Sequence, residues 1–154
     1  MKRIHHTLPF LTLLALPLSA HEGHPHVPPA LYADKLAFAP RPLPDRIVLT
    51  WRGDPATTQA VTWRTDTTIT RAVAEFAVAN EAGRTLKGES ITARTEPLTT
   101  DLSEAHYHSA EFTGLTPETL YAYRVGDGVN WSEWFHFRTA SRDAKKFTFV
   151  YFGD

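Results

Sequence analysis

From residue 46 onward, hydrophobic and polar residues alternate with a period of two, interrupted by glycine, proline and aspartate. The stretch 46–52 (RIVLTWR) places apolar side chains on one face, at Ile47, Leu49 and Trp51. This alternation predicts strands with one buried face, because successive side chains of a strand point to opposite sides. Further candidate strands cover the stretches 59–64, 72–78, 85–100 (one or two strands), 107–112, 120–125 and 135–139. Short strands divided by such turns predict an antiparallel sandwich of about seven strands.

The most specific local signal is the stretch 114–125 (GLTPETLYAYRV), where a turn runs into a strand that begins with Tyr121. In β-sandwiches such a tyrosine can return its hydroxyl to the upstream backbone and fix the corner. The stretch resembles the fibronectin type III pattern L-x-P-x-T-x-Y-x-Y-x-V at all six defined positions. We therefore expect residues 45–140 to form an all-β, fibronectin-III/immunoglobulin-like sandwich. Sandwiches of this kind host many functions, so the pattern indicates no chemistry.

The last fourteen residues follow a different pattern. A charged linker (141–146, SRDAKK) precedes a stretch that is apolar on both faces (147–152, FTFVYF) and ends in Gly153-Asp154. Strands without alternation are typical of sheets that helices cover on both sides. We expect residues 141–154 to be a linker and the first strand of a second, α/β domain that is truncated here. The alternative is an additional sandwich strand that pairs at an edge.

Asp154 is the candidate metal ligand of the chain. In open α/β sheets, ligands bind beyond the carboxyl ends of the strands, which is where this carboxylate would lie. Carboxylate oxygens suit hard metals, and a pair of metals can activate water and hold a phosphoryl group. Gly-Asp at the end of a strand is also an ordinary turn, so the dipeptide alone leaves both interpretations open.

The first twenty residues have the layout of a secretory signal peptide. Lys2 and Arg3 precede an apolar run at 8–18, and the small residues Ser19 and Ala20 end the segment. The run is too short to span a bilayer, which takes about 20 residues. We expect removal of residues 1–20 and a secreted or periplasmic protein that has no membrane contact after cleavage. The alternative is a buried N-terminal strand or helix.

The segment 21–44 is rich in proline and histidine, and it reads as an extended tail. Cleavage after Ala20 would give His21 a free amino group, and His24 and His26 could add metal ligands. This cluster supports a rival function, an exported metal-binding module. The other interpretation is a solvated tail without a ligand.

Composition removes several classes of function. The formal net charge of −1 gives no reason to expect a nucleic acid or an anionic membrane as a partner. The chain has no cysteine, which excludes a disulfide framework, a thiolate metal site and a lipid anchor on cysteine.

The order of these parts resembles the purple acid phosphatases. The segments that carry the resemblance are 44–55 (PDRIVLTWRGDP), 60–65 (AVTWRT), 107–112 (YHSAEF), the tyrosine corner and the apolar strand ending in Gly-Asp. In that family a fibronectin-III-like sandwich precedes a metallophosphoesterase domain. The resemblance implies that Asp154 matches a ligand to the iron of a two-metal centre, whose second metal is zinc, manganese or iron. It also implies that the other ligand motifs (G-D-x-x-Y, G-N-H-[DE] and two histidine motifs) would follow Asp154.

The resemblance further implies a parent enzyme that hydrolyses phosphate monoesters. The sandwich would then be structural and pack on the missing catalytic domain. The chain would contain no catalytic residue and would be inactive alone, because a metal pair needs several preorganised ligands.

A few aromatic and histidine residues keep further alternatives open. Trp131 and Trp134 could form a sugar-binding platform in a carbohydrate-binding or adhesion module, or they could serve core and interdomain packing. His106 and His108 would share one strand face and could chelate a metal. We expect His108 and His136 to be sandwich residues, packed or partly exposed.

Overall fold

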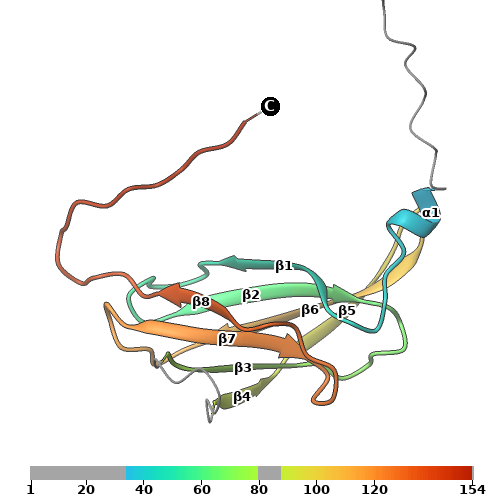
Figure 1. Ribbon diagram of the computed structural model, residues 1–154, viewed down its shortest axis with the longest axis horizontal. Helices are drawn as coiled ribbons and strands as arrows, with labels where there is room; N and C mark the ends of the chain where they lie inside the picture. Colours follow the sequence, from blue (N-terminus) through green and yellow to red (C-terminus); the bar gives the residue numbers. More distant parts are fainter. Residues whose placement is uncertain (1–33, 80–87, 154) are drawn as a thin grey trace, which may run out of the picture. The chain divides into compact units, whose positions relative to one another are not determined.

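The computed structural model describes residues 34–79 and 88–153 (Figure 1). The predicted signal peptide, the cluster of His21, His24 and His26, and the candidate ligand Asp154 all lie outside the described residues. Within the described part, no helix is long and apolar enough to cross a membrane.

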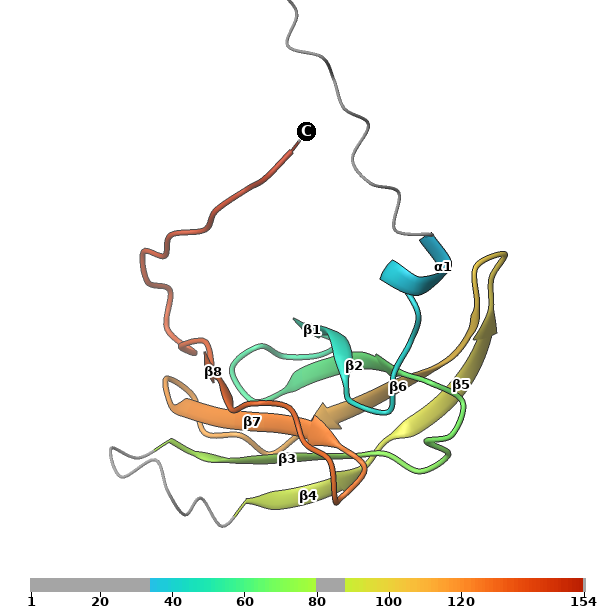
Figure 2. The same ribbon diagram turned by 45° about the vertical axis from the view of Figure 1, so that its right-hand side comes forward.

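The described residues form two four-stranded antiparallel sheets, as expected for an all-β sandwich (Figures 1 and 2). The first sheet has the strand order β1-β2-β6-β5 and the second has the order β4-β3-β7-β8. The elements are α1 (Asp34–Ala37), β1 (Asp45–Thr50), β2 (Gln59–Thr65), β3 (Val73–Val78), β4 (Glu89–Thr92), β5 (Arg94–Thr99), β6 (Glu104–Phe112), β7 (Leu120–Gly126) and β8 (Phe135–Arg138). The predicted sandwich fold is confirmed, with eight strands instead of about seven. The difference arises at 85–100, where β4 and β5 are separated by Ala93 alone and belong to opposite sheets.

The core lies between the sheets and is built from the inward side chains that the alternation predicts. Val61 and Trp63 of β2 are fully buried, and Phe112 of β6 lies 4.7 Å from Phe76 of β3, measured between ring centroids. Burying such side chains is the main stabilising contribution, at about 1.5–3 kcal/mol for each large apolar residue.

The prediction for Trp51 is wrong. Ile47 and Leu49 of β1 pack against the core as expected, but the strand ends at Thr50. Trp51 therefore lies beyond the last paired residue, and 68% of it is exposed. The alternation continued past the point where the chain has a neighbouring strand to pair with.

The apolar stretch 147–152 forms no strand within the described part of the chain. Its large apolar side chains are between 74% and 87% exposed. The alternative of an additional edge strand is wrong, because this stretch pairs with neither sheet. An extended segment without a neighbour has no ladder of hydrogen bonds and nothing to bury it. Its assignment to a second domain stays a prediction.

Candidate functional site: the exit junction of the sandwich

Within the described residues, the candidate ligands His106 and His108 do not form a metal site. Among residues 34–79 and 88–153, no group of three histidine, cysteine, aspartate or glutamate side chains could hold a metal ion. His136 lies on β8 and is exposed, whereas His106 and His108 lie on β6. The His106 ring uses Nδ1 to contact the carbonyl oxygen of Ile69 at 2.8 Å.

His108 is a packed residue with both ring nitrogens occupied. Its Nε2 lies 2.8 Å from the Thr65 hydroxyl and its Nδ1 lies 2.9 Å from the Thr95 hydroxyl. The ring is buried beside Trp63, with 5.3 Å between centroids. Burial, followed by the nearby His106, lowers the pKa of His108 from 6.5 to about 4. A neutral, doubly hydrogen-bonded imidazole supports the sandwich interpretation over chelation.

Trp131 and Trp134 enclose an arginine. The guanidinium carbon of Arg124 lies 4.1 Å from the Trp131 ring centroid and 4.8 Å from that of Trp134. Arg124 also forms an ion pair with Glu75 on β3, at 2.7 Å. Each indole thus uses one face for a cation–π contact within the domain, so that face is not free for a sugar. This group of Trp131, Arg124 and Trp134, which we call the Arg124 stack, covers part of the outer face of the second sheet.

The tyrosine corner forms as predicted. The backbone N–H of Thr116 donates a hydrogen bond to the Tyr121 hydroxyl at 2.9 Å. One contact therefore joins the start of β7 to the loop before it, as such corners do in β-sandwiches. The corner is confirmed as a structural feature, and it lies at the end of the domain from which the chain leaves.

Three loops meet at this end of the sandwich, and we call their meeting point the exit junction. It consists of the β1–β2 turn (54–58), the corner (114–119) and the exit segment (139–145). Leu115 N–H donates to the Thr57 carbonyl at 3.0 Å, and Ala140 N–H donates to the Pro55 carbonyl at 2.9 Å. Glu118 N–H donates in turn to the Ala140 carbonyl at 3.2 Å. Each loop is thus bonded to another through backbone groups, which few side-chain changes would remove.

Asp54 shapes the turn that receives the exit segment. Its carboxylate accepts a hydrogen bond from Ala56 N–H at 2.9 Å and another from the Thr57 hydroxyl at 3.0 Å. The hydrogen bond from Ala56, followed by that from Thr57, lowers the pKa of Asp54. An aspartate that caps its own turn in this way presents the Pro55 carbonyl to Ala140.

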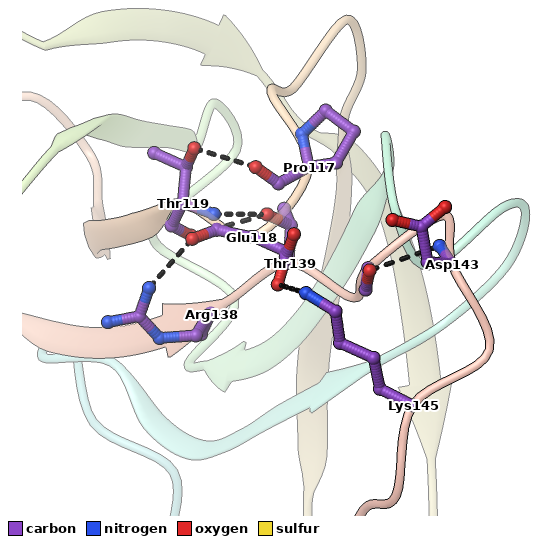
Figure 3. Close-up of polar contacts among 8 residues, drawn as sticks. Pro117, Glu118, Thr119, Arg138, Thr139, Asp143 and Lys145 are labelled. Carbon is purple, nitrogen blue, oxygen red and sulfur yellow. Dashed lines mark hydrogen bonds and ion pairs between the residues drawn. The ribbon is translucent and has the colours of Figure 1, made fainter.

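Thr139 is the buried centre of the junction (Figure 3). Its hydroxyl accepts a hydrogen bond from Thr119 N–H at 2.9 Å and donates one to the Thr116 carbonyl at 2.6 Å. One side chain therefore satisfies a donor and an acceptor of the corner backbone. Leaving such groups unpaired in a buried position would cost about 1–3 kcal/mol each.

Glu118 occupies a conformation that usually belongs to glycine, with φ of 54°. This conformation costs a residue with a side chain on the order of 1–2 kcal/mol. The Glu118 carbonyl accepts a hydrogen bond from Arg138 at 2.7 Å, and its carboxylate forms an ion pair with Lys145 (Figure 3). The Lys145 hydrogen bond lowers the pKa of Glu118. A groove of about 420 Å³ lies between the corner and the exit segment.

Sequence reasoning recognised the parts of the exit junction but not their assembly. The Gly-Asp-Pro turn and the corner both stood out as motifs, about 60 residues apart in the chain. The two motifs lie together because of the order of the strands in the sheets, and the sequence of neither motif specifies that order.

Comparisons with known proteins give a family match and several similar solved structures. A sequence model of the family described as "Purple acid Phosphatase, N-terminal domain" matches residues 44–139. A solved structure from a computer-based redesign of a β-sandwich protein is 24% identical, with a TM-score of 0.42, and the match covers 65% of this chain and 96% of that one. Astrotactin-2, described as a vertebrate-specific, perforin-like membrane protein, is 16% identical, with a TM-score of 0.47, and the match covers 65% of this chain and 22% of that one. No curated protein matches.

The match to the family includes the eight strands of the described residues, since β1 begins at Asp45 and β8 ends at Arg138. It also includes the β1–β2 turn and the tyrosine corner, the two motifs that meet at the exit junction. The matched region covers more than half of the sequence. The chain therefore belongs to the purple acid phosphatase N-terminal domain family and has a phosphatase-family origin.

Proposed function

We propose that this chain is the N-terminal part of a secreted acid phosphatase that hydrolyses phosphate monoesters at a two-metal centre. In this proposal the sandwich is a structural domain, and the chain of 154 residues is inactive alone. The exit junction is the observation that carries the structural role. The family match supports the phosphatase origin. Ala140 is hydrogen-bonded on both sides, through its N–H to Pro55 and through its carbonyl to Glu118.

An exit segment held in this way has a defined starting direction. A flexible linker would let the following domain move freely against the sandwich, whereas an anchored one limits that freedom. The ion pair of Lys145 with Glu118 extends the contact five residues past Ala140. We infer that the sandwich sets where the segment 147–153 begins, and with it the position of the phosphoesterase domain.

The described residues do not fit a two-metal centre. They contain no three-residue ligand group, and both nitrogens of His108 are engaged by threonine hydroxyls. Asp154, which we propose as the counterpart of the family's iron ligand, lies outside both the family match and the described residues. The proposal therefore places the metals, iron and a second ion such as zinc, manganese or iron, in the following domain. No step of phosphate ester hydrolysis is assigned to the sandwich.

Export is part of the same proposal. The layout of residues 1–20 supports recognition by a secretory pathway, with cleavage after Ala20. Residues 21–44 would then begin the mature protein and lead into the sandwich. The partners expected for the parent enzyme are a phosphate ester substrate and its own catalytic domain, without nucleic acid and without a membrane after cleavage.

Activity measurements on two proteins test the proposal. We would prepare the chain of 154 residues and the full-length gene product, both with iron and zinc supplied, and assay hydrolysis of p-nitrophenyl phosphate. The full-length protein should be active and the chain of 154 residues inactive. Asp154→Ala in the full-length protein should reduce activity by about 100-fold or more, since even residues that only support ligands contribute 10- to 100-fold. Comparable activity of the short chain, or none in a folded, metal-loaded full-length protein, would contradict the proposal.

A further inference from the structure

We propose that the peptide bond between Lys146 and Phe147 is a processing site, at which a protease of the trypsin class separates the sandwich from the segment that follows. Hydrolysis breaks the C–N bond of this peptide. Water supplies the hydroxyl group of the new Lys146 carboxyl and the proton of the new Phe147 amine. Proteases of this class hold the lysine or arginine before the bond in an acidic pocket. The site therefore needs a basic side chain and an exposed backbone that can extend into the protease.

The segment after the last strand supplies three basic residues, Arg142, Lys145 and Lys146. Residues 142–153 are all exposed, and none of them belongs to a strand. Exposed segments without backbone pairing are preferred sites of proteolysis, because the protease must draw the chain into its cleft. The segment thus offers three bonds to a protease of this class, and the contacts of the exit junction distinguish between them.

The bond after Arg142 is protected by the exit junction. Ala140, two positions before Arg142, has both its N–H and its carbonyl hydrogen-bonded within the junction, at 2.9 and 3.2 Å. Asp143 supplies the nitrogen of the bond, and its N–H donates to the Ser141 hydroxyl at 3.0 Å. A protease that bound this stretch in extended form would have to break these hydrogen bonds. The bond after Arg142 is therefore the least accessible of the three.

The bond after Lys145 is disfavoured by an ion pair. The Lys145 ammonium contacts the carboxylate of Glu118, and both side chains are about half exposed (Figure 3). Glu118 is held in place, because its carbonyl accepts a hydrogen bond from Arg138 at 2.7 Å. Lys145 must leave this pair before it can enter the acidic pocket of a protease. Exposed ion pairs are weak, so the pair slows cleavage after Lys145 without preventing it.

Lys146 is the first basic residue beyond these contacts. Among residues 34–79 and 88–153, no hydrogen bond or ion pair involves the stretch 146–153. Phe147, on the other side of the bond, is 83% exposed. The bond between Lys146 and Phe147 thus combines an unpaired basic side chain with a backbone that no sheet holds.

Cleavage at this bond leaves every contact of the exit junction on the side of the sandwich. The last of these contacts is the ion pair of Lys145, and residues 147–152 pair with neither sheet. The product keeps both sheets and loses an apolar stretch whose large side chains are between 74% and 87% exposed. In a longer protein the same cut would uncouple the sandwich from the domain that follows. A meeting with such a protease outside the cell rests on the export proposed above, whereas the choice of the bond rests on the exit junction alone.

Brief digestion of the chain of 154 residues with trypsin, followed by mass spectrometry, tests the choice of bond. Cleavage after Lys146 releases the peptide 147–154 (FTFVYFGD). Cleavage after Lys145 releases the peptide 146–154, and cleavage after Arg142 releases 143–154. At early times the peptide 147–154 should be the most abundant of the three, and 143–154 the least.

Two substitutions separate the effect of the junction from that of exposure alone. Lys146→Gln should remove the peptide 147–154 from the digest, because the side chain before the bond is no longer basic. Glu118→Gln frees Lys145 and should raise cleavage after Lys145 by about two- to fivefold, the range that an exposed ion pair allows. Glu133→Gln is the matched control, since Glu133 is exposed and lies outside the junction. It should leave the proportions of the three peptides unchanged.

Release of the peptide 143–154 ahead of 147–154 would overturn the proposal, because the junction would then not protect its own bonds. The folded full-length protein should be cut at the same bond and give a fragment that begins with FTFVYF. A full-length protein that is cut at other bonds but stays intact between Lys146 and Phe147 would also overturn the proposal. Phosphatase activity of that preparation before digestion is a separate measurement, and its absence would overturn the proposed function instead.

Discussion

The backbone N–H of Ala140 donates a hydrogen bond to the carbonyl of Pro55 at 2.9 Å. This contact joins the segment after the last strand of one sheet to the turn after the first strand of the other. It crosses the sandwich at the point where the chain leaves it. Two of the motifs that carry the resemblance to the family, the Gly-Asp-Pro turn and the tyrosine corner, both contact this segment.

The hydroxyl of Thr139 should be the most important side-chain group of the exit junction. Thr139→Val keeps the shape but removes the partner of Thr119 N–H and of the Thr116 carbonyl. We expect a loss of about 2 kcal/mol in the free energy of unfolding, because buried polar groups lose their partners. Urea denaturation of the chain of 154 residues measures this.

Thr139→Ser is the control for that change, because it retains the hydroxyl and removes one methyl group. It should lose less than the valine variant. If serine costs more than valine, packing of the methyl group and not hydrogen bonding holds the junction.

The buried His108 predicts a pH dependence of stability. Its pKa is about 4 in the folded protein, against 6.5 without burial, so the unfolded chain binds more protons between these values. Stability therefore rises with pH across this window, and it falls by up to about 3 kcal/mol as pH decreases from 6.5 to 4. The carboxyl groups with lowered pKa, Asp54, Glu118 and Asp127, lose stability as pH falls through their ordinary values, 4.5 for Glu118 and 3.8 for the two aspartates. The loss from Glu118 therefore begins at the lower end of this window, and that from the aspartates lies mainly below it.

Denaturation at pH 7 and pH 4.5 separates this effect from others. His108→Gln should flatten the dependence on pH, whatever it does to stability at pH 7. His136→Gln should leave the dependence as in the natural chain, because His136 is exposed on β8. An unchanged slope in the His108 variant would show that another group controls the pH response.

The Arg124 stack should contribute to stability more than an exposed ion pair does. Arg124→Ala removes two cation–π contacts and the ion pair with Glu75, and we expect a loss of about 1–2 kcal/mol. Tryptophan emission should move to longer wavelength as the two indoles become exposed. The comparison is Arg94→Ala, whose ion pair with Glu96 is exposed and should contribute less than about 0.5 kcal/mol. Equal effects of the two substitutions would argue against a structural role for the stack.

The fold was predictable because its signals are local. Alternation identifies β2 and β3 by itself, and the tyrosine corner depends on residues only five positions apart, Thr116 and Tyr121. The failure at Trp51 is also local in origin. Periodicity shows which face a side chain would take in a strand, but only a neighbouring strand decides where the strand ends.

The candidate site was not predictable because it is assembled from distant segments. Arg124 is separated in sequence from its ion-pair partner Glu75 by 49 positions. The sequence therefore did not indicate that Arg124 is held on the outer face of the second sheet, where it contacts both Trp131 and Trp134. The three loops of the exit junction likewise meet only because the strand order brings the ends of β1, β6 and β8 together. Composition and residue spacing do not indicate which distant segments of the chain lie in contact.

The coding sequence beyond codon 154 tests the central claim most directly. If this chain is the N-terminal part of a two-metal phosphatase, the reading frame continues and encodes G-D-x-x-Y, G-N-H-[DE] and two later histidine motifs. Asp154 is then the first ligand of that set. A stop codon directly after Asp154 in the intact gene would contradict the account, and the sandwich with its tail of His21, His24 and His26 would need another function.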